Sequence, residues 1–293
     1  MEDRIRKAVK QNKVIAYSFV IIKNFEIDKF AASGGGVNVH TKFQAASLSK
    51  TLTALISLKL VEQKLLKLIE IKELLSHSAG ISVPGFGGYE HNQKIPNLSQ
   101  ILEGISPANS PKIFQKYKSG RYRYSGGGFM ILQKMIEDAI GKPFPIVVNE
   151  LVFKTLGMKQ STFELIKINK NDHLYPESAA AGLWTTPTDF TKLLIEIGSA
   201  LKGKGKVLSK KSAQVMLTKY LPSVGLGTFV HKTKNRIQFT HNGANFGYRA
   251  RYIFFSDGNG VVVMTKSNDF KFIDRAVRAI GKEYGWGKFK VKI

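Results

Sequence analysis

The tetrapeptide Ser47-Leu48-Ser49-Lys50 contains the first residues whose types and spacing could carry out catalysis. A serine hydroxyl is a weak nucleophile until a neighbour takes its proton, and a lysine can do so when burial or nearby cations lower its pKa. Residues three apart share one face of a helix, so Lys50 is expected within hydrogen-bonding reach of Ser47. The N–H of Ser47, at the helix start, is free to bind an oxyanion. The spacing predicts nucleophilic catalysis.

This spacing alone is a weak signal, because a lysine-rich chain produces it by chance. A second copy, Ser199-Ala200-Leu201-Lys202, runs into a glycine- and lysine-rich loop at residues 203–206 that would hold its side chains poorly. We interpret the second copy as accidental.

The second candidate is Tyr124-Ser125-Gly126, within a stretch rich in glycine, arginine and tyrosine at residues 121–128. Consecutive glycines let a backbone pass close to a ligand. A tyrosine there can shuttle protons, and cations such as Lys50 are expected to favour its phenolate form, as a general base requires. In isolation, a tyrosine is more often a packed aromatic side chain.

The third candidate is His241-Asn242-Gly243-Ala244, which follows a predicted strand ending at Thr240 and precedes another that begins at Tyr248. This position at a sheet edge offers free backbone N–H groups to a developing oxyanion. His241 can donate a hydrogen bond or tune the charge of its neighbours, although a lone histidine is more often structural. Four other histidines, His40, His91, His173 and His231, show no partner pattern.

Two groups of strands, one at each end of the chain, are predicted to frame these candidates. The first is an antiparallel pair at Val14–Ile22 and Phe25–Ala31, and the second comprises Gly227–His231, Arg236–Thr240, Tyr248–Ser256 and Gly260–Lys266. Helices are expected at residues 3–12, at Ser47–Leu66, which is apolar on more than one face and so buried, and at Ile273–Tyr284.

The middle of the chain, residues 70–220, alternates helical stretches with loops rich in glycine, proline and serine, so it is predicted to be mostly helical. One helix start is well marked: Thr186 can cap it, Pro187 fits its first turn, and Asp189 can close a capping box. This places Trp184 on the preceding loop.

The order of these elements predicts an α/β (α+β) fold with one sheet built from both chain ends and an inserted, mostly helical lobe. We expect a sheet lobe formed by residues 1–46 and 221–293, a helical lobe formed by residues 47–220, and a catalytic cleft between them.

The chain is strongly basic, with 45 Lys+Arg against 21 Asp+Glu and a formal net charge of +24. Such a surface attracts polyanions, and cell-wall polymers or anionic lipids fit as well as nucleic acid. A lysine-rich proteome would give the same balance. Because no zinc-finger spacing, RNP-type strand or basic zipper is present, specific nucleic-acid binding is not expected.

The absence of cysteine excludes thiol catalysis, disulfides and cysteine-based metal sites. The longest apolar run, Val14–Ile22, falls far short of the roughly 20 residues needed to span a bilayer. Met1 leads into charged residues without the apolar core of a signal peptide. The chain is therefore expected to be cytoplasmic, or a mature form that acts in the periplasm or outside the cell.

The three motifs, in this order and at these separations, resemble the serine β-lactamase and penicillin-binding protein superfamily, in its class C-like branch. That branch includes class C β-lactamases, D-Ala-D-Ala carboxypeptidases, D-aminopeptidases and related esterases. The resemblance extends over roughly residues 12–285 and includes Phe43–Ser47, Leu74–Ile81, Ala181–Asp189 and Asp257–Asn268.

This resemblance implies an antiparallel sheet flanked by helices beside a helical lobe, with no metal or cofactor. It implies that Ser47 is the nucleophile, Lys50 its partner and Tyr124 the proton shuttle. His241 stands where the family has Lys or His, and His77 belongs to a segment that the family uses for packing. The backbone N–H groups of Ser47 and Ala244 would form the oxyanion hole, and the expected substrate contacts are Ser125, Gly126, Gly243 and Trp184.

Three departures from the family pattern bear on the substrate. Gly126 replaces a common Asn that binds a substrate amide, and His241 replaces the Lys of typical class C β-lactamases. Efficient β-lactam hydrolysis is therefore not expected. The stretch from Glu62 to Glu73 is short, which predicts an open rim of the cleft.

The leading hypothesis is a serine hydrolase that forms an acyl-enzyme on Ser47 from an ester, amide or lactam substrate, with Tyr124 and Lys50 activating the deacylating water. The substrate would be a small molecule or peptide, and an anionic cell-wall fragment would be concentrated by the basic surface. The arginines of the C-terminal part, Arg249, Arg251, Arg275 and Arg278, are expected to border the site. The alternative is a catalytically weak protein that binds penicillin or a cell-wall polymer. The oligomeric state is left open.

Overall fold

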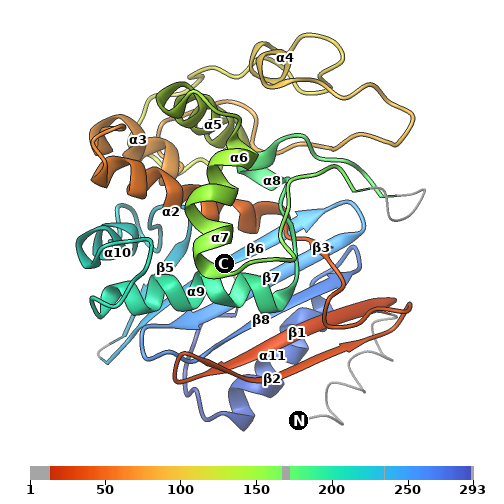
Figure 1. Ribbon diagram of the computed structural model, residues 1–293, viewed down its shortest axis with the longest axis vertical. Helices are drawn as coiled ribbons and strands as arrows, with labels where there is room; N and C mark the ends of the chain where they lie inside the picture. The colour runs from red at the N-terminus through yellow and green to blue at the C-terminus, as the bar shows by residue number, and fades with distance from the viewer. Residues whose placement is uncertain (1–13, 167–171, 234, 292–293) are drawn as a thin grey trace.

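A six-stranded antiparallel sheet forms one side of the computed structural model, which describes residues 14–166, 172–233 and 235–291 (Figure 1). The strand order is β2-β1-β8-β7-β6-β5. The strands are β1 (Ala16–Lys23), β2 (Glu26–Ser33), β5 (Phe229–Lys232), β6 (Ile237–Asn245), β7 (Tyr248–Phe255) and β8 (Gly260–Lys266). The sheet therefore joins both ends of the chain, as predicted. The helix expected at residues 3–12 lies outside the described residues.

Strand β6 is longer than predicted, and this changes the setting of the third motif. The expected end at Thr240 rested on the polar residue and glycine that follow, which usually weaken a strand. In the structure Asn242 pairs with Arg251 and Ala244 with Arg249, so the ladder with β7 continues to Asn245. The His241 motif consequently lies within a strand.

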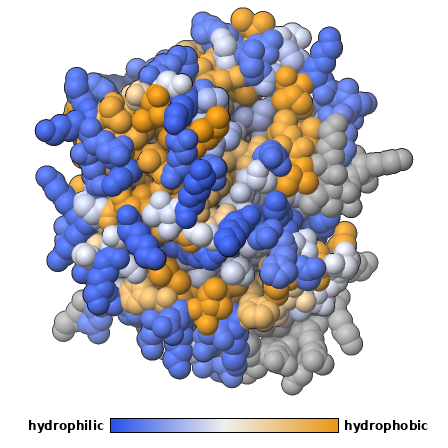
Figure 2. All heavy atoms as spheres, viewed as in Figure 1, coloured by the Kyte–Doolittle hydropathy of each residue, from blue (hydrophilic) through white to orange (hydrophobic). Residues whose placement is uncertain are grey.

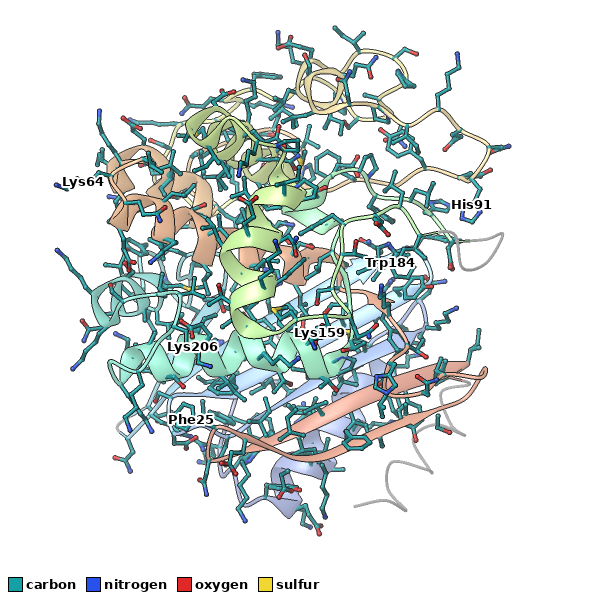
Figure 3. The ribbon with its side chains drawn as sticks, in the orientation of Figure 1. Phe25, Lys64, His91, Lys159, Trp184 and Lys206 are labelled. Atoms are coloured by element: carbon teal, nitrogen blue, oxygen red, sulfur yellow. The ribbon has the colours of Figure 1, made fainter. Side chains whose placement is uncertain are left out.

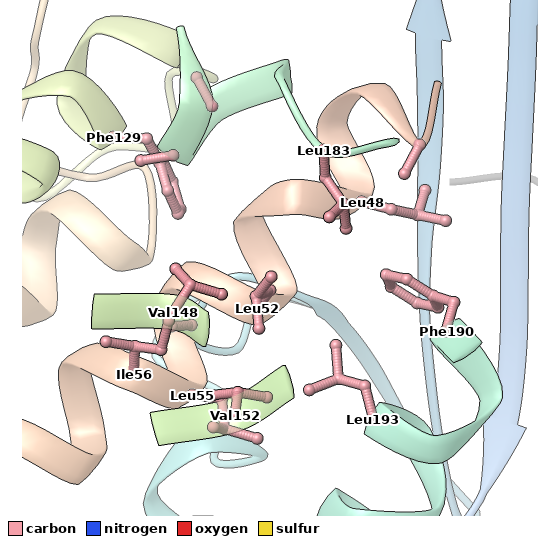
Figure 4. Close-up of a cluster of buried hydrophobic side chains, with 14 of the residues drawn as sticks. Leu48, Leu52, Leu55, Ile56, Phe129, Val148, Val152, Leu183, Phe190 and Leu193 are labelled. Carbon is pink, nitrogen blue, oxygen red and sulfur yellow. The ribbon is translucent and has the colours of Figure 1, made fainter. Parts of the chain in front are cut away.

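The helix that follows the candidate nucleophile is buried on nearly all sides. Ser47 lies in a 3-10 turn, η1 (Ala46–Leu48), which leads directly into α2 (Ser49–Glu62). Leu52, Leu55 and Ile56 of α2 contact apolar side chains of the surrounding helices (Figure 4). This confirms the predicted buried helix, and the apolar surroundings set the electrostatic environment of Lys50.

The middle of the chain contains two longer helices and several shorter helical segments. They are α3 (Leu68–Leu75), α4 (Leu98–Glu103), α5 (Gly126–Ile140), α6 (Phe144–Val148), the π-helical segment η2 (Asn149–Phe153), α7 (Lys154–Leu156), α8 (Ser178–Ala181), α9 (Pro187–Leu201) and α10 (Lys210–Met216). The longer helices are α5 and α9, and α6, η2 and α7 follow one another without a break. The small sheet β3 (Phe43–Gln44) and β4 (Trp184–Thr185) ties the segment before Ser47 to the segment before α9.

Two hydrophobic clusters lie on the two faces of the large sheet. The larger includes Phe239, Tyr252 and Phe254 and extends into α2 and α9. The smaller includes Ile253 and Phe255 and packs against α11 (Lys271–Glu283). Successive strand residues point to opposite faces, so β7 contributes to both clusters. The closing helix predicted at Ile273–Tyr284 is thus confirmed and covers the face opposite α9.

Helix α9 begins where the sequence predicts it. Thr186 Oγ1 accepts the Asp189 N–H at 3.1 Å, and Pro187 occupies the first turn. The capping box is wrong, however, because the Asp189 carboxylate accepts the Gln160 N–H at 2.6 Å and pairs with Lys192 Nζ at 2.8 Å. Asp189 therefore ties α9 to the preceding loop.

Hydrophilic side chains are spread over the face seen in Figure 2, with hydrophobic side chains between them. Within the described ranges, no helix has the length and apolarity needed to cross a membrane.

Candidate active site

Ser47 and Lys50 are held together as their spacing predicts. Lys50 Nζ donates to Ser47 Oγ at 3.1 Å and to the Ala180 carbonyl oxygen at 2.7 Å. Ala46 adopts a left-handed φ of 51°, which L-residues with a side chain rarely take, so the backbone turns sharply just before the nucleophile. Ser49 Oγ donates to the Ala46 carbonyl at 2.6 Å and stabilises this turn.

Lys50 is almost completely buried, at 2% exposure. Burial removes water from the ammonium group and lowers the pKa of Lys50 from 10.5 to about 7. A substantial fraction of the amine is therefore neutral near pH 7, and a neutral amine can accept the proton of Ser47. The ring of Phe129 lies 5.4 Å from Nζ and contributes to the apolar surroundings.

Tyr124 completes the group. Lys50 Nζ lies 5.1 Å from the centre of the Tyr124 ring, and a side-chain hydrogen bond joins Tyr124 and Ser47. The expectation that cations favour the phenolate is wrong. Burial raises the pKa of Tyr124 far above neutrality and outweighs the hydrogen bond from Ser47, which lowers it. Tyr124 is therefore a neutral phenol that can pass a proton between its neighbours.

His77 contacts Tyr124 directly, which sequence reasoning missed. Its ring lies 4.3 Å from the Tyr124 ring between centroids, and its Nδ1 accepts the Ser125 N–H at 3.1 Å. An Nδ1 that accepts this bond carries no proton, so the neutral tautomer has its proton on Nε2. Burial together with Lys50 and His241 lowers the pKa of His77 well below its usual value. The only sequence signal was its place in the family-like segment Leu74–Ile81.

His241 is also neutral in this environment. Burial and the nearby Lys50 lower the pKa of His241 to about 3. Its Nδ1 lies 2.7 Å from the Asn242 carbonyl oxygen, so Nδ1–H is the donor and Nε2 carries a lone pair. Nε2 is buried and has no hydrogen-bond partner among the described residues. His241 therefore brings no positive charge to the site, unlike a lysine at this position.

The outer edge of β6 faces the nucleophile. Strand β5 pairs with β6 only as far as Thr240, so later residues of β6 have no strand beside them in the described part of the chain. Thr240 directs its carbonyl to the β5 side, where Thr228 donates to it, and Ile237 directs its carbonyl to β7. Backbone groups alternate along a strand, so the N–H of the exposed Ala244 points to the free edge.

Gly243 allows β6 to approach the turn before Ser47. A Cβ atom at Gly243 would lie 2.2 Å from the Ala45 carbonyl oxygen, a distance that no real Cβ contact reaches. Because Ala45 is two residues before Ser47, this contact sets the distance between the nucleophile and the edge of β6. The structure thus gives Gly243 a positioning role in addition to the substrate contact expected from the sequence.

Ser125 and Gly126, both expected to contact the substrate, are buried and make structural contacts in the protein. Ser125 is buried; its Oγ accepts the Gly128 N–H at 3.1 Å as the N-cap of α5 and donates to the Ser82 carbonyl at 2.9 Å. A Cβ at Gly126 would lie 2.9 Å from the Phe86 ring. Phe86 therefore lies directly against Gly126 and makes the surroundings of this position apolar.

Trp184 was expected on a loop, and this is wrong. It pairs with Gln44 in the β3–β4 sheet, is 2% exposed and packs its edge on Tyr248 with ring centroids 5.5 Å apart (Figure 3). Its burial is explained by this packing, and we leave it out of the proposed substrate contacts.

The C-terminal arginines support the sheet and do not converge on Ser47. Arg251 donates to the Asn242 side chain at 2.6 Å and pairs with Asp274 of α11. Arg249 donates to the Asn245 carbonyl at 2.6 Å and to the Asn268 carbonyl at 2.7 Å. Arg278 lines a separate cavity. Across the described residues, no three His, Cys, Asp or Glu side chains are grouped as metal ligands would be.

Similarity to solved structures defines the class of fold. The chain is similar to the octameric penicillin-binding protein homologue from Pyrococcus abyssi, with TM-score 0.75, 19% identity and coverage of 97% of this chain and 76% of that chain. It is similar to D-amino acid amidase from Ochrobactrum anthropi SV3, with TM-score 0.76, 17% identity and coverage of 96% and 99%. The predicted fold is confirmed as that of β-lactamases and penicillin-binding proteins.

The family follows from the sequence. The Beta-lactamase family model matches residues 1–282, so the chain belongs to the Beta-lactamase family, as its motifs predicted. It is 24% identical to a Teichoic acid D-alanine hydrolase from Staphylococcus aureus (strain NCTC 8325 / PS 47) over 219 residues, which are 67% of this chain and 51% of that protein. The chain spans about half the length of the curated relatives it matches.

Proposed function

We propose that this protein is a serine hydrolase that transfers the acyl group of its substrate to Ser47 and then to water. The observation that carries this proposal is the contact between Lys50 Nζ and Ser47 Oγ at 3.1 Å, made by an amine whose pKa is lowered to about 7. Buried lysines are usually paired with an acid, whereas the acceptors of Lys50 Nζ among the described residues are a hydroxyl and a backbone carbonyl.

In the acylation step, neutral Lys50 takes the proton of Ser47 while Oγ forms a bond to the substrate carbonyl carbon. The tetrahedral intermediate collapses when the bond to the leaving group breaks. The proton of the Lys50 ammonium then reaches the leaving group through the Tyr124 hydroxyl, which releases one proton and receives another. This relay needs a neutral Tyr124, which its burial favours.

The carbonyl oxygen becomes negatively charged in the intermediate. We propose that the N–H groups of Ser47 and Ala244 bind it, because Ser47 follows the sharp turn at Ala46 and Ala244 directs its N–H to the free edge of β6. Backbone donors fixed in advance stabilise such an oxyanion without reorganisation. Gly243 sets the separation of the two donors.

Deacylation reverses the proton path. Water attacks the acyl carbon, its proton passes through Tyr124 to Lys50, and the ester bond to Ser47 Oγ breaks. Lys50 returns a proton to Oγ and the acid product leaves. These proposed roles are the ones expected from the sequence, except that Lys50 in place of Tyr124 is the final base in deacylation and Tyr124 relays the proton.

We propose an ester of a D-amino acid, such as D-alanine, as the substrate, in preference to a β-lactam. His241 is neutral and offers no cation to a lactam carboxylate. Phe86 lies where an amide-binding asparagine would stand, which favours an ester over a peptide amide. The names of the Teichoic acid D-alanine hydrolase and the D-amino acid amidase point to acyl groups of this class.

We retain the division into a sheet lobe (1–46 and 221–293) and a helical lobe (47–220) as part of this proposal. Ser47, Lys50 and Tyr124 come from the middle segment, whereas His241 and Ala244 come from the sheet. The reactive groups would then meet where the two lobes join.

The test is turnover of four substrates: a D-alanyl ester, the L-alanyl ester that differs from it only in chirality, the D-alanyl amide that differs from it only in the scissile bond, and a fluorescent penicillin. We expect the D-alanyl ester to be hydrolysed fastest and Ser47→Ala to abolish its turnover. Equal activity of Ser47→Ala would overturn the acyl-enzyme proposal. Preference for the amide or the L-alanyl ester would overturn the substrate class alone.

A further inference from the structure

A basic cavity lies away from the catalytic groups, on the side of the sheet covered by α11. Its volume is about 1030 Å³. It is bounded by the ends of β5 and β6, by α11 and by the segment after α11. The reaction proposed for Ser47 uses none of its lining residues.

The lining of this cavity carries positive charge and no carboxylate. Its six cationic side chains are Lys219, Lys232, Arg278, Lys282, Lys288 and Lys290. All six residues are exposed, and among the described residues none of them forms a salt bridge with an acid. Six like charges around one hollow repel one another and destabilise the folded state unless an anion binds between them.

His231, which also lines the cavity, lies close enough to the cationic side chains for them to lower its pKa. Its Nε2 is buried without a hydrogen-bond partner among the described residues, and its Nδ1 lies 3.4 Å from Ser223 Oγ. Burial, Lys219 and Lys290 all lower the pKa of His231. The unpartnered Nε2 gives the cavity a polar group in addition to its lysines.

The wall of the cavity is fixed in place. Gln238 of β6 donates to the Lys290 carbonyl at 2.6 Å and accepts the Lys290 N–H at 2.9 Å, and Arg236 donates to the Trp286 carbonyl. The segment after α11 is therefore bonded to β6, and its cations are held beside those of β5. A cavity wall held by these side-chain-to-backbone hydrogen bonds does not need to form when a ligand arrives.

We propose that this cavity is a binding site for a flexible chain of phosphate groups, and specifically for the phosphodiester backbone of a linear anionic polymer. Several separated cations match several phosphates in series, because each Lys acts as a point charge for phosphate. A recessed cavity admits a flexible chain but does not match the flat surface of a membrane or a rigid duplex.

The location connects this site with the proposed reaction. Gln238 lines the cavity, and His241 of the catalytic group lies three positions further along β6, about 10 Å along the strand and on the opposite face of the sheet. Because β5 is the edge strand, a flexible polymer held in the cavity could pass round this edge and present an ester on a more distant unit to Ser47. This second statement rests on the proposed function, whereas the binding itself does not.

The experiment measures binding of the full chain to poly(glycerol phosphate) freed of its esters, at several salt concentrations. We expect Lys282→Glu/Lys288→Glu to weaken binding by about tenfold or more and to reduce the salt dependence. The control Lys64→Glu/Lys206→Glu makes the same change of charge at exposed residues outside the cavity and should leave binding near the wild-type value (Figure 3). Equal loss in both variants would overturn the proposal, since it would show that net charge alone attracts the polymer.

Two further arms separate the alternatives. Ser47→Ala should bind the polymer as well as wild type, and Lys282→Glu/Lys288→Glu should hydrolyse p-nitrophenyl acetate normally. Oligothymidylate and phosphatidylglycerol vesicles are tested in the same way. The assignment to this polymer would be overturned if either bound as tightly as poly(glycerol phosphate) and lost as much affinity in the cavity variant. Failure of the proposed hydrolysis would instead appear as a loss of Ser47-dependent turnover with binding intact.

Discussion

The amine of Lys50 lies 3.1 Å from the hydroxyl of Ser47 and is buried in a helix that is apolar on nearly all sides. This relationship links fold to reactivity. The apolar core around α2 lowers the pKa of the amine, and the helix spacing delivers it to the nucleophile.

The rate of ester hydrolysis should rise with pH. Lys50 must be neutral to accept a proton, and its pKa is about 7, so kcat/KM for p-nitrophenyl acetate should increase through that pH and level off above it. Lys50→Arg keeps a positive charge at every accessible pH and should lose about a thousandfold or more in rate. A wild-type profile that stays flat between pH 5 and 9 would contradict Lys50 as the base.

The lowered pKa of Lys50 should also make the free energy of unfolding depend on pH. Unfolded Lys50 titrates near its ordinary value of 10.5, so between pH 7 and 10 the unfolded state binds more protons than the folded state. Stability then rises with pH in that window, by at most about 1.4 kcal/mol per pH unit. Urea unfolding of wild type and Lys50→Met at pH 7 and pH 9 should show wild type gaining about 2 kcal/mol relative to the variant. No relative gain would mean that the folded-state pKa of Lys50 is not lowered.

Gly243→Ala should impair catalysis through geometry. Its Cβ would collide with the Ala45 carbonyl and push β6 away from Ser47, and a displaced oxyanion donor costs about a hundredfold in kcat. Gly85→Ala is the control, because a Cβ at exposed Gly85 meets no atom within 4 Å and its φ is not positive. Turnover of p-nitrophenyl butyrate measures both. A fully active Gly243→Ala would remove the basis for pairing Ser47 with Ala244.

The apolar surface at Phe86 should determine the preference for esters. Gly126→Asn alone is expected to collide with the Phe86 ring and lose activity. Phe86→Ala/Gly126→Asn makes room for the amide side chain, and the ratio of amide to ester turnover should rise by about tenfold, the value of one good hydrogen bond. An unchanged ratio in an active double variant would show that substrate choice lies elsewhere.

The arrangement of strands was accessible from sequence because apolar runs and turn residues mark it at both chain ends. The pairing of Ser47 with Lys50 was equally accessible, since helix geometry fixes the distance between residues three apart. Contacts between segments that are distant in the sequence could not be predicted from it. Nothing local indicates that the Ala180 carbonyl holds Lys50, or that His77 packs on Tyr124, because both depend on how separate elements dock.

Protonation states were the weakest part of the prediction. A sequence shows that cations stand near Tyr124, but the sign of its pKa shift depends on whether charge or desolvation is larger. Burial is the larger effect here, and it keeps both Tyr124 and His241 neutral. The full length of β6 was also missed, because it depends on tertiary structure. Pairing with β7 overrides the weak strand preference of Asn242 and Gly243.

Intact-mass analysis of acylation tests the central claim most directly. Wild type and Ser47→Ala are incubated with a fluorescent penicillin and with p-nitrophenyl acetate, quenched in acid, and digested to locate any adduct. We predict one acyl group per wild-type chain, carried by the peptide that contains Ser47, and none on Ser47→Ala. An unmodified wild-type chain that still hydrolyses the ester, or equal labelling of Ser47→Ala, would contradict the acyl-enzyme on Ser47.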